Sequence, residues 1–112
     1  MDDVEEIKKL KARYFRSLDS KDWELYASVF AEDCLVDLRT AGGELYEGRA
    51  AFVAYASSLT LVQSVHHGHM PEIDLTSATT ATGVWGLEDY NIWEDGSQNH
   101  GWGHYLESYV KR

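Results

Sequence analysis

The sequence is poor in proline and cysteine, and it has no long apolar run. Its 112 residues include one proline, Pro71, and one cysteine, Cys34. A single cysteine excludes an internal disulfide, and none of the apolar stretches is long enough to cross a bilayer. The chain opens with Asp2 and Asp3 after Met1, whereas a signal peptide opens with positive charge. These absences predict a soluble cytoplasmic protein without a membrane partner.

Basic residues are also scarce. Ten lysines and arginines stand against nineteen aspartates and glutamates, which gives a formal net charge of −9. Nucleic acids and anionic membranes bind basic surfaces, so neither is expected as a partner. A chain of this length forms one domain, residues 1–112, with room for one core and one pocket.

The first part of the chain has a helical pattern. Val4, Ile7, Leu10, Tyr14 and Leu18 recur every three to four residues, which predicts a helix with lysines and glutamates on its other face. We expect this helix to end at residue 19 and a second to begin after the capping residues 20 and 22. Further elements are expected at 34–38 and 45–46, as short strands, and at 49–58, as a third helix.

From residue 60 onward the hydrophobic period changes to two. The pattern predicts long antiparallel strands at about 61–75, 79–93 and 99–110. Helices followed by such strands indicate an α+β domain. Glycines within the strands favour a strongly curved sheet that encloses a pocket. The chain ends at Arg112 without a turn or cap, as expected if a last strand is missing.

Three histidines, His66, His67 and His69, fall within four residues. Histidine serves near neutral pH as a base, an acid or a metal ligand. Strand alternation places His66 on one face with Met70, and His67 and His69 on the other. His66 is therefore the better candidate for a base in a pocket. His67 and His69 supply half of a metal site that no Cys/His pair or His-Glu motif completes, so we expect no metal. Three structural histidines remain the alternative.

Three polar residues stand at positions where burial or an unfavourable interaction with a helix dipole is predicted: Tyr14, Asp19 and Asp89. Tyr14 lies at the centre of the apolar stripe, and Asp19 opposes the dipole at a helix C-terminus. Asp89 alternates with Trp85 and Leu87 on an apolar face, so its carboxylate needs a partner. Core packing of Tyr14 and a cross-strand hydrogen bond of Asp89 are the structural alternatives.

Several segments resemble SnoaL-like domains of the nuclear-transport-factor-2-like superfamily. They include KARYFRSLD at 11–19 and HHGHMPEI at 66–73, with shorter matches at 22–23, 30–33, 79–85 and 88–89. The resemblance covers nearly the whole chain and is closest to the branch of scytalone dehydratase, the bile-acid 7α-dehydratases and the lindane dehydrochlorinase. It implies a cone-shaped α+β barrel that eliminates water or halide without a metal or organic cofactor.

The resemblance also implies roles for individual residues. A histidine base and a helix-end aspartate form the family's catalytic pair, and they match His66 and Asp19. A tyrosine and a second aspartate of the bile-acid branch match Tyr14 and Asp89, and His69 also has a histidine counterpart there. The residues that we expect to contact substrate are His69, Trp85, Leu87 and Met70.

Function follows as a hypothesis. Four tryptophans and seven tyrosines favour a hydrophobic ligand or a subunit interface. We expect a cofactor-independent dehydratase-type lyase that acts on a polycyclic or steroid-like hydroxy ketone. The alternatives are an isomerase or polyketide cyclase with the same base, and a non-catalytic binding or oligomerisation module. The resemblance further implies a homodimer or homotrimer.

Overall fold

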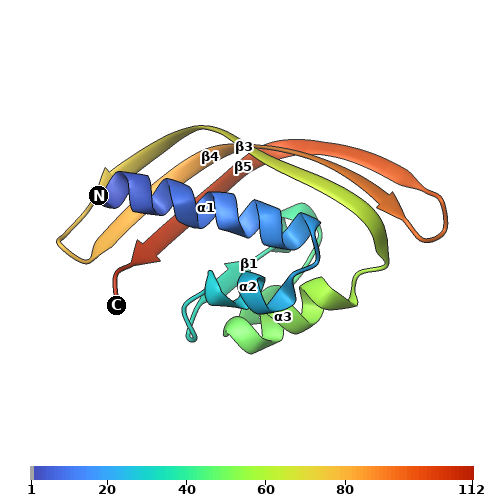
Figure 1. Cartoon of the computed structure of the whole chain (residues 1–112), viewed down its shortest axis with the longest axis horizontal. Helices are drawn as coiled ribbons and strands as arrows, with labels where there is room; N and C mark the ends of the chain where they lie inside the picture. The colour runs from blue at the N-terminus through green and yellow to red at the C-terminus, as the bar shows by residue number, and fades with distance from the viewer. Residues whose placement is uncertain (1) are drawn as a thin grey trace.

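Within residues 2–112, one long helix is laid along three long strands, and the smaller elements are gathered at one end of that helix (Figure 1). The structure is a computed structural model that describes residues 2–112. Met1, which belongs to the expected domain, lies outside this range. The elements in chain order are α1 (Asp3–Asp19), α2 (Trp23–Ser28), β1 (Leu35–Asp37), the 3-10 turn η1 (Arg39–Ala41), β2 (Leu45–Glu47), α3 (Arg49–Ser58), β3 (Leu61–Leu75), β4 (Thr80–Trp93) and β5 (Gln98–Val110).

The predicted helices are present, and side chains begin the first two. The Asp2 carboxylate accepts a hydrogen bond from the backbone N–H of Glu5 at 2.9 Å, which satisfies a free donor of the first turn of α1. Asp22 does the same for α2 by accepting from the N–H of Leu25 at 3.2 Å. Helix α1 ends at Asp19, as predicted.

The long strands form an antiparallel meander in the order β3-β4-β5, and β1 pairs with β2 in a separate hairpin. This arrangement confirms the α+β class. Among residues 2–112, none of the described strands joins the hairpin to the long sheet, and the strong curvature and cone-shaped closure of the sheet stay predictions.

The core lies where the C-terminal end of α1 meets α2, α3 and the hairpin. Its buried members are Leu18, Tyr26, Phe52 and Ala56. Tyr26 is 1% exposed, and its ring lies 5.4 Å from that of Tyr14 and 5.0 Å from that of Phe30. This aromatic packing fixes the end of α1 and with it Asp19.

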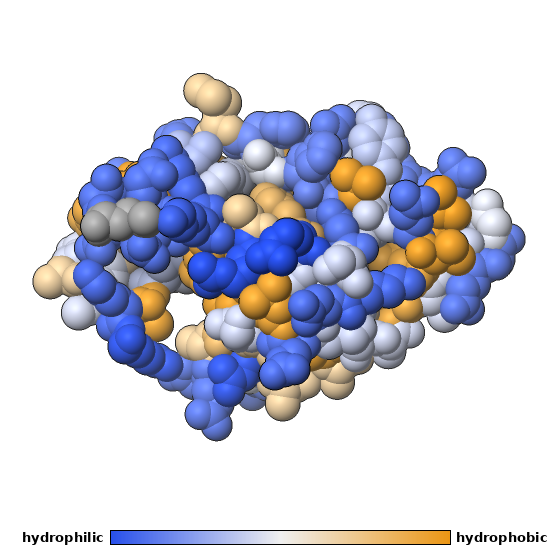
Figure 2. All heavy atoms as spheres, in the orientation of Figure 1, coloured by the Kyte–Doolittle hydropathy of each residue, from blue (hydrophilic) through white to orange (hydrophobic). Residues whose placement is uncertain are grey.

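Alternation along β4 orients the inner face of the sheet. Ala81 and Trp85 are buried there, as the period of two predicts. Gly68 of β3 allows close contact between sheet and helix, because a Cβ at this position would lie 2.8 Å from the Phe15 ring and 3.1 Å from Trp85. The opposite side of α1 carries mainly hydrophilic side chains (Figure 2). Among residues 2–112, no helix combines the length and apolar character needed to span a membrane.

The contact at Gly68 predicts a position-specific loss of stability. We expect Gly68→Ala to lower the free energy of unfolding by about 1–3 kcal/mol, because the new methyl group must displace Phe15 or Trp85. Gly103→Ala is the matched control, since a Cβ at Gly103 has no neighbour within 4 Å. Urea denaturation of both variants measures the difference, and equal stabilities would contradict the packing described here.

Candidate functional site

Asp19 and His66 form the centre of the site. The Asp19 Oδ1 atom lies 2.7 Å from His66 Nδ1 and accepts a hydrogen bond from Ser64 Oγ at 2.9 Å. Its Oδ2 atom accepts the backbone N–H of His66 at 2.8 Å. These donors offset the unfavourable position of a carboxylate at the C-terminus of α1. The same contacts fix both the backbone and the ring of His66.

The geometry selects one tautomer of His66. A carboxylate only accepts hydrogen bonds, so the 2.7 Å contact requires the proton on Nδ1. Nε2 of the neutral ring then carries the free lone pair and is the atom able to take a proton. The His66 side chain is 12% exposed, so the ring is not fully enclosed.

Asp89 faces the same edge of His66 from the neighbouring strand. His66 and Asp89 are register partners on β3 and β4, and Asp89 Oδ2 lies 3.7 Å from His66 Nε2. The other oxygen, Oδ1, accepts the backbone N–H of Gly101 at 3.1 Å. The cross-strand bond considered as a structural alternative is therefore present, while the second oxygen remains directed at His66. A Cβ at Gly101 would lie 2.7 Å from Asp89 Oδ1, so a side chain there would displace this oxygen.

Tyr14 contributes a neutral phenol beside this pair. Burial raises the pKa of Tyr14 to about 12, although hydrogen bonds with Tyr26 and Tyr105 oppose the rise. The negative charges of Glu107 and Asp19 raise this pKa further. The hydroxyl is therefore protonated at neutral pH and acts as a hydrogen-bond donor, not as a base.

Next to Tyr14 lies a partly buried ion pair that the sequence pattern did not predict. Lys11 is 3% exposed, and its Nζ donates to Glu107 Oε2 at 2.6 Å. The same nitrogen lies 3.4 Å from the centre of the Tyr105 ring. Burial lowers the pKa of Lys11, although Glu107 opposes this. The prediction that lysines cover only the exposed face of α1 is thus wrong at Lys11. The sequence signal for its burial was its spacing, because Lys11 comes four residues after Ile7 and three before Tyr14, which both belong to the apolar stripe.

The four expected substrate contacts occupy different places. Trp85 is 6% exposed, and its Nε1 donates to Tyr109 Oη at 2.9 Å. Leu87 is half-buried on the same strand, between Trp85 and Asp89. Met70 does not share the His66 face as predicted: it is 91% exposed, with a φ of 39°, at a register shift between His69 and Glu72 that interrupts the alternation.

His69 also lies away from His66. Its Nε2 is 3.5 Å from Glu88 Oε1 on the other face of the sheet. His67 joins these two residues there, and the three side chains could hold a metal ion. The sequence pattern predicted that the two histidines share a face, but it did not predict the carboxylate that completes the group.

Among residues 2–112, neither of two prominent cavities includes His66 in its wall. A cavity of about 460 Å³ is bounded by the N-terminal half of α1 and the ends of the long strands, with Ile7, Leu10 and Tyr109 in its wall. A smaller one of about 100 Å³ reaches Ser64 from the side of Leu18 and Trp23. Ser64, a hydrogen-bond donor to Asp19, thus separates the smaller cavity from the Asp19–His66 pair.

Several solved structures are similar in fold to this chain. A putative aromatic ring hydroxylase from Novosphingobium aromaticivorans superposes with a TM-score of 0.86 at 20% identity, over 91% of this chain and 73% of that one. A putative scytalone dehydratase from the same organism gives 0.85 at 24%, over 95% and 72%. The hexachlorocyclohexane dehydrochlorinase LinA-type3 from Novosphingobium barchaimii gives 0.82 at 15%, over 95% and 74%.

At these identities the likeness shows a shared fold. The family assignment rests on the sequence itself, because the model of the SnoaL-like domain matches residues 1–112. The chain belongs to the SnoaL-like domain family.

Proposed function

We propose that the protein is a cofactor-independent lyase in which His66 is the general base. The observation that carries this proposal is the Asp19–His66 pair, which holds Nδ1 at 2.7 Å from a carboxylate and leaves Nε2 free. A carboxylate in this position orients the imidazole and stabilises its charged form once a proton is taken. The likeness to a dehydratase and a dehydrochlorinase supports elimination as the reaction class.

The proposed substrate is a hydrophobic hydroxy ketone of polycyclic or steroid-like shape. His66 Nε2 takes the proton from the carbon next to the carbonyl, and the electron pair moves into an enolate. The enolate then expels the hydroxyl on the β-carbon. That hydroxyl leaves as water with the proton returned from the imidazolium, so no proton is gained or lost overall.

Tyr14 and Asp89 assist this sequence in different ways. Tyr14, whose raised pKa keeps its hydroxyl protonated, donates a hydrogen bond to the carbonyl oxygen as negative charge develops there. Asp89 lies 3.7 Å from His66 Nε2, and it stabilises the imidazolium and helps the hydroxyl to depart. Leu87 and Trp85 supply apolar surface beside Asp89. We further propose that the substrate binds in an enclosed, cone-shaped pocket. The proposal also includes a cytoplasmic location and assembly into a homo-oligomer.

An isomerase or polyketide cyclase is the alternative that the same geometry favours, since it needs the same proton abstraction and enolate. Mass analysis of the product distinguishes the reactions: loss of water marks a lyase, and unchanged mass marks an isomerase. Tight binding of such ketones without any product would favour a binding module.

The tautomer of His66 is directly measurable. In ¹⁵N-labelled protein we expect the neutral His66 ring to carry its proton on Nδ1, because Asp19 accepts it. Asp19→Asn should increase the Nε2–H form, since the amide no longer provides two carboxylate acceptors. Imidazole ¹⁵N chemical shifts report both states. An Nε2–H ring in the unaltered protein would contradict the proposed base.

Turnover should depend on the same pair. We expect His66→Ala to reduce dehydration of a responsive β-hydroxy ketone by about 10²–10⁴-fold, the usual contribution of a general base. Asp19→Asn should also reduce the rate of dehydration. Circular dichroism should show that the fold of this variant is intact. His104→Ala, which changes an exposed histidine on β5, is the matched control and should retain full activity. Unchanged turnover in His66→Ala would refute the mechanism.

A further inference from the structure

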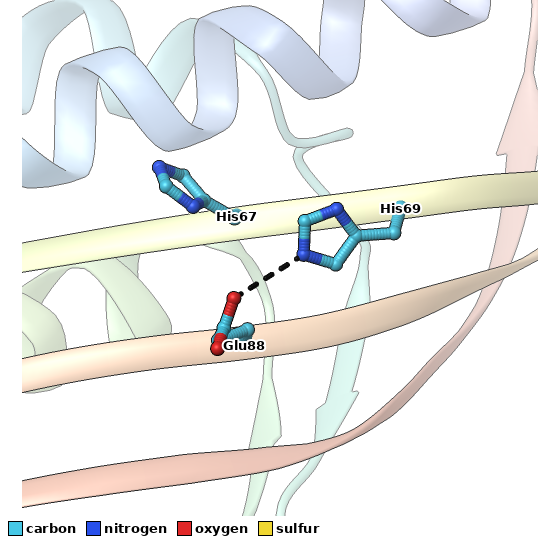
Figure 3. A group of neighbouring side chains, drawn as sticks. All are labelled: His67, His69 and Glu88. Atoms are coloured by element: carbon cyan, nitrogen blue, oxygen red, sulfur yellow. Dashed lines mark ion pairs between the residues drawn. The ribbon is translucent and has the colours of Figure 1, made fainter.

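The face of the sheet opposite the Asp19–His66 pair carries a second group of ionisable side chains. His67 and His69 project from β3, and Glu88 projects toward them from β4 (Figure 3). His67 and Glu88 are register partners, while His67 and His69 are two residues apart on one face of the strand. One ligand atom from each of the three lies within 4.8 Å of the other two.

These separations suit a small transition-metal ion. Zinc binds imidazole nitrogen and carboxylate oxygen at roughly 2.0–2.2 Å, so neighbouring ligand atoms around a tetrahedral ion lie about 3.4 Å apart. His69 Nε2 and Glu88 Oε1 are already 3.5 Å apart, longer than an ordinary hydrogen bond. The His69 side chain is 54% exposed and that of Glu88 36%, so both can make the small rotations that close the remaining gap.

Glu88 is oriented by a partner on its other side. Its second oxygen, Oε2, lies 3.0 Å from His100 Nε2. The His100 ring is stacked on Tyr90 with 3.9 Å between centroids and 13° between planes. This stacking fixes His100, and a fixed partner on the distal oxygen orients a carboxylate toward an ion.

From this arrangement we propose that His67, His69 and Glu88 bind a divalent transition-metal ion of the zinc class. His100 is a positioning residue that orients Glu88. Three protein ligands leave a fourth coordination position open to water or to another ligand. Two imidazoles and one carboxylate favour zinc, cobalt, nickel or copper over magnesium and calcium, which prefer oxygen ligands.

The proposed metal site does not depend on the proposed elimination chemistry. Successive residues of a strand point to opposite faces, so His66 and Asp89 are directed to the helix side while His67 and Glu88 are directed away. Failure of either proposal therefore leaves the other intact.

The test is a titration of the full chain, purified without a polyhistidine tag and treated with a chelator. Isothermal titration calorimetry with zinc chloride should show saturable binding of a single ion per chain. Cobalt chloride should produce the visible absorption bands of a four-coordinate site. His67→Ala, His69→Ala and Glu88→Gln should each weaken zinc binding by at least about tenfold, and His100→Ala by about 10–100-fold.

Glu72→Gln is the matched control, because Glu72 is an exposed acid on β3 outside the group. It should bind zinc as the unaltered chain does. Circular dichroism of each variant verifies folding. Absence of saturable zinc binding, or undiminished binding in a His67→Ala/His69→Ala double variant, would overturn the proposal.

Discussion

One carboxylate joins the long helix to the long sheet. Asp19 closes α1, yet its oxygens accept hydrogen bonds from Ser64 and from both the backbone and the ring of His66 on β3. The aromatic core around Tyr26 holds the end of α1, so Asp19 has little freedom to move. The position of the proposed base thus follows from packing that takes no part in the chemistry. It also explains how an aspartate is retained at a helix end whose dipole disfavours it.

The pleat of β3 and β4 gives the same two strands two separate polar groups. His66 and Asp89 meet on the face covered by α1, and His67 and Glu88 meet on the other face. The same inner face holds the Lys11–Glu107 ion pair, in which the Lys11 Nζ atom lies against the rings of Tyr14 and Tyr105. A site with a neutral phenol, an oriented imidazole and two carboxylates is suited to moving a proton next to a carbonyl.

Local patterns in the sequence predicted the helices and strands. They did not predict which residues of neighbouring strands lie opposite each other. Periodicity predicted the end of α1 at Asp19 and the inward face of β4 at Trp85, and both are confirmed. The pairing of Asp19 with His66 came from the family resemblance, because spacing along a chain does not show which distant residues meet. Met70 was misplaced since one irregularity after His69 breaks a strict period of two. Glu88 was not linked to His67 and His69 because cross-strand partners depend on the turn between β3 and β4.

The central claim is that His66 Nε2 removes a proton from carbon next to a carbonyl, and isotope exchange tests it without requiring the natural substrate. A panel of hydrophobic cyclic ketones is incubated with the protein in D₂O, and NMR follows deuterium uptake at the carbon next to the carbonyl. The account predicts exchange faster than in buffer for ketones that bind, with the increase abolished in His66→Ala. Exchange that is equal in the unaltered protein and in His66→Ala would contradict it.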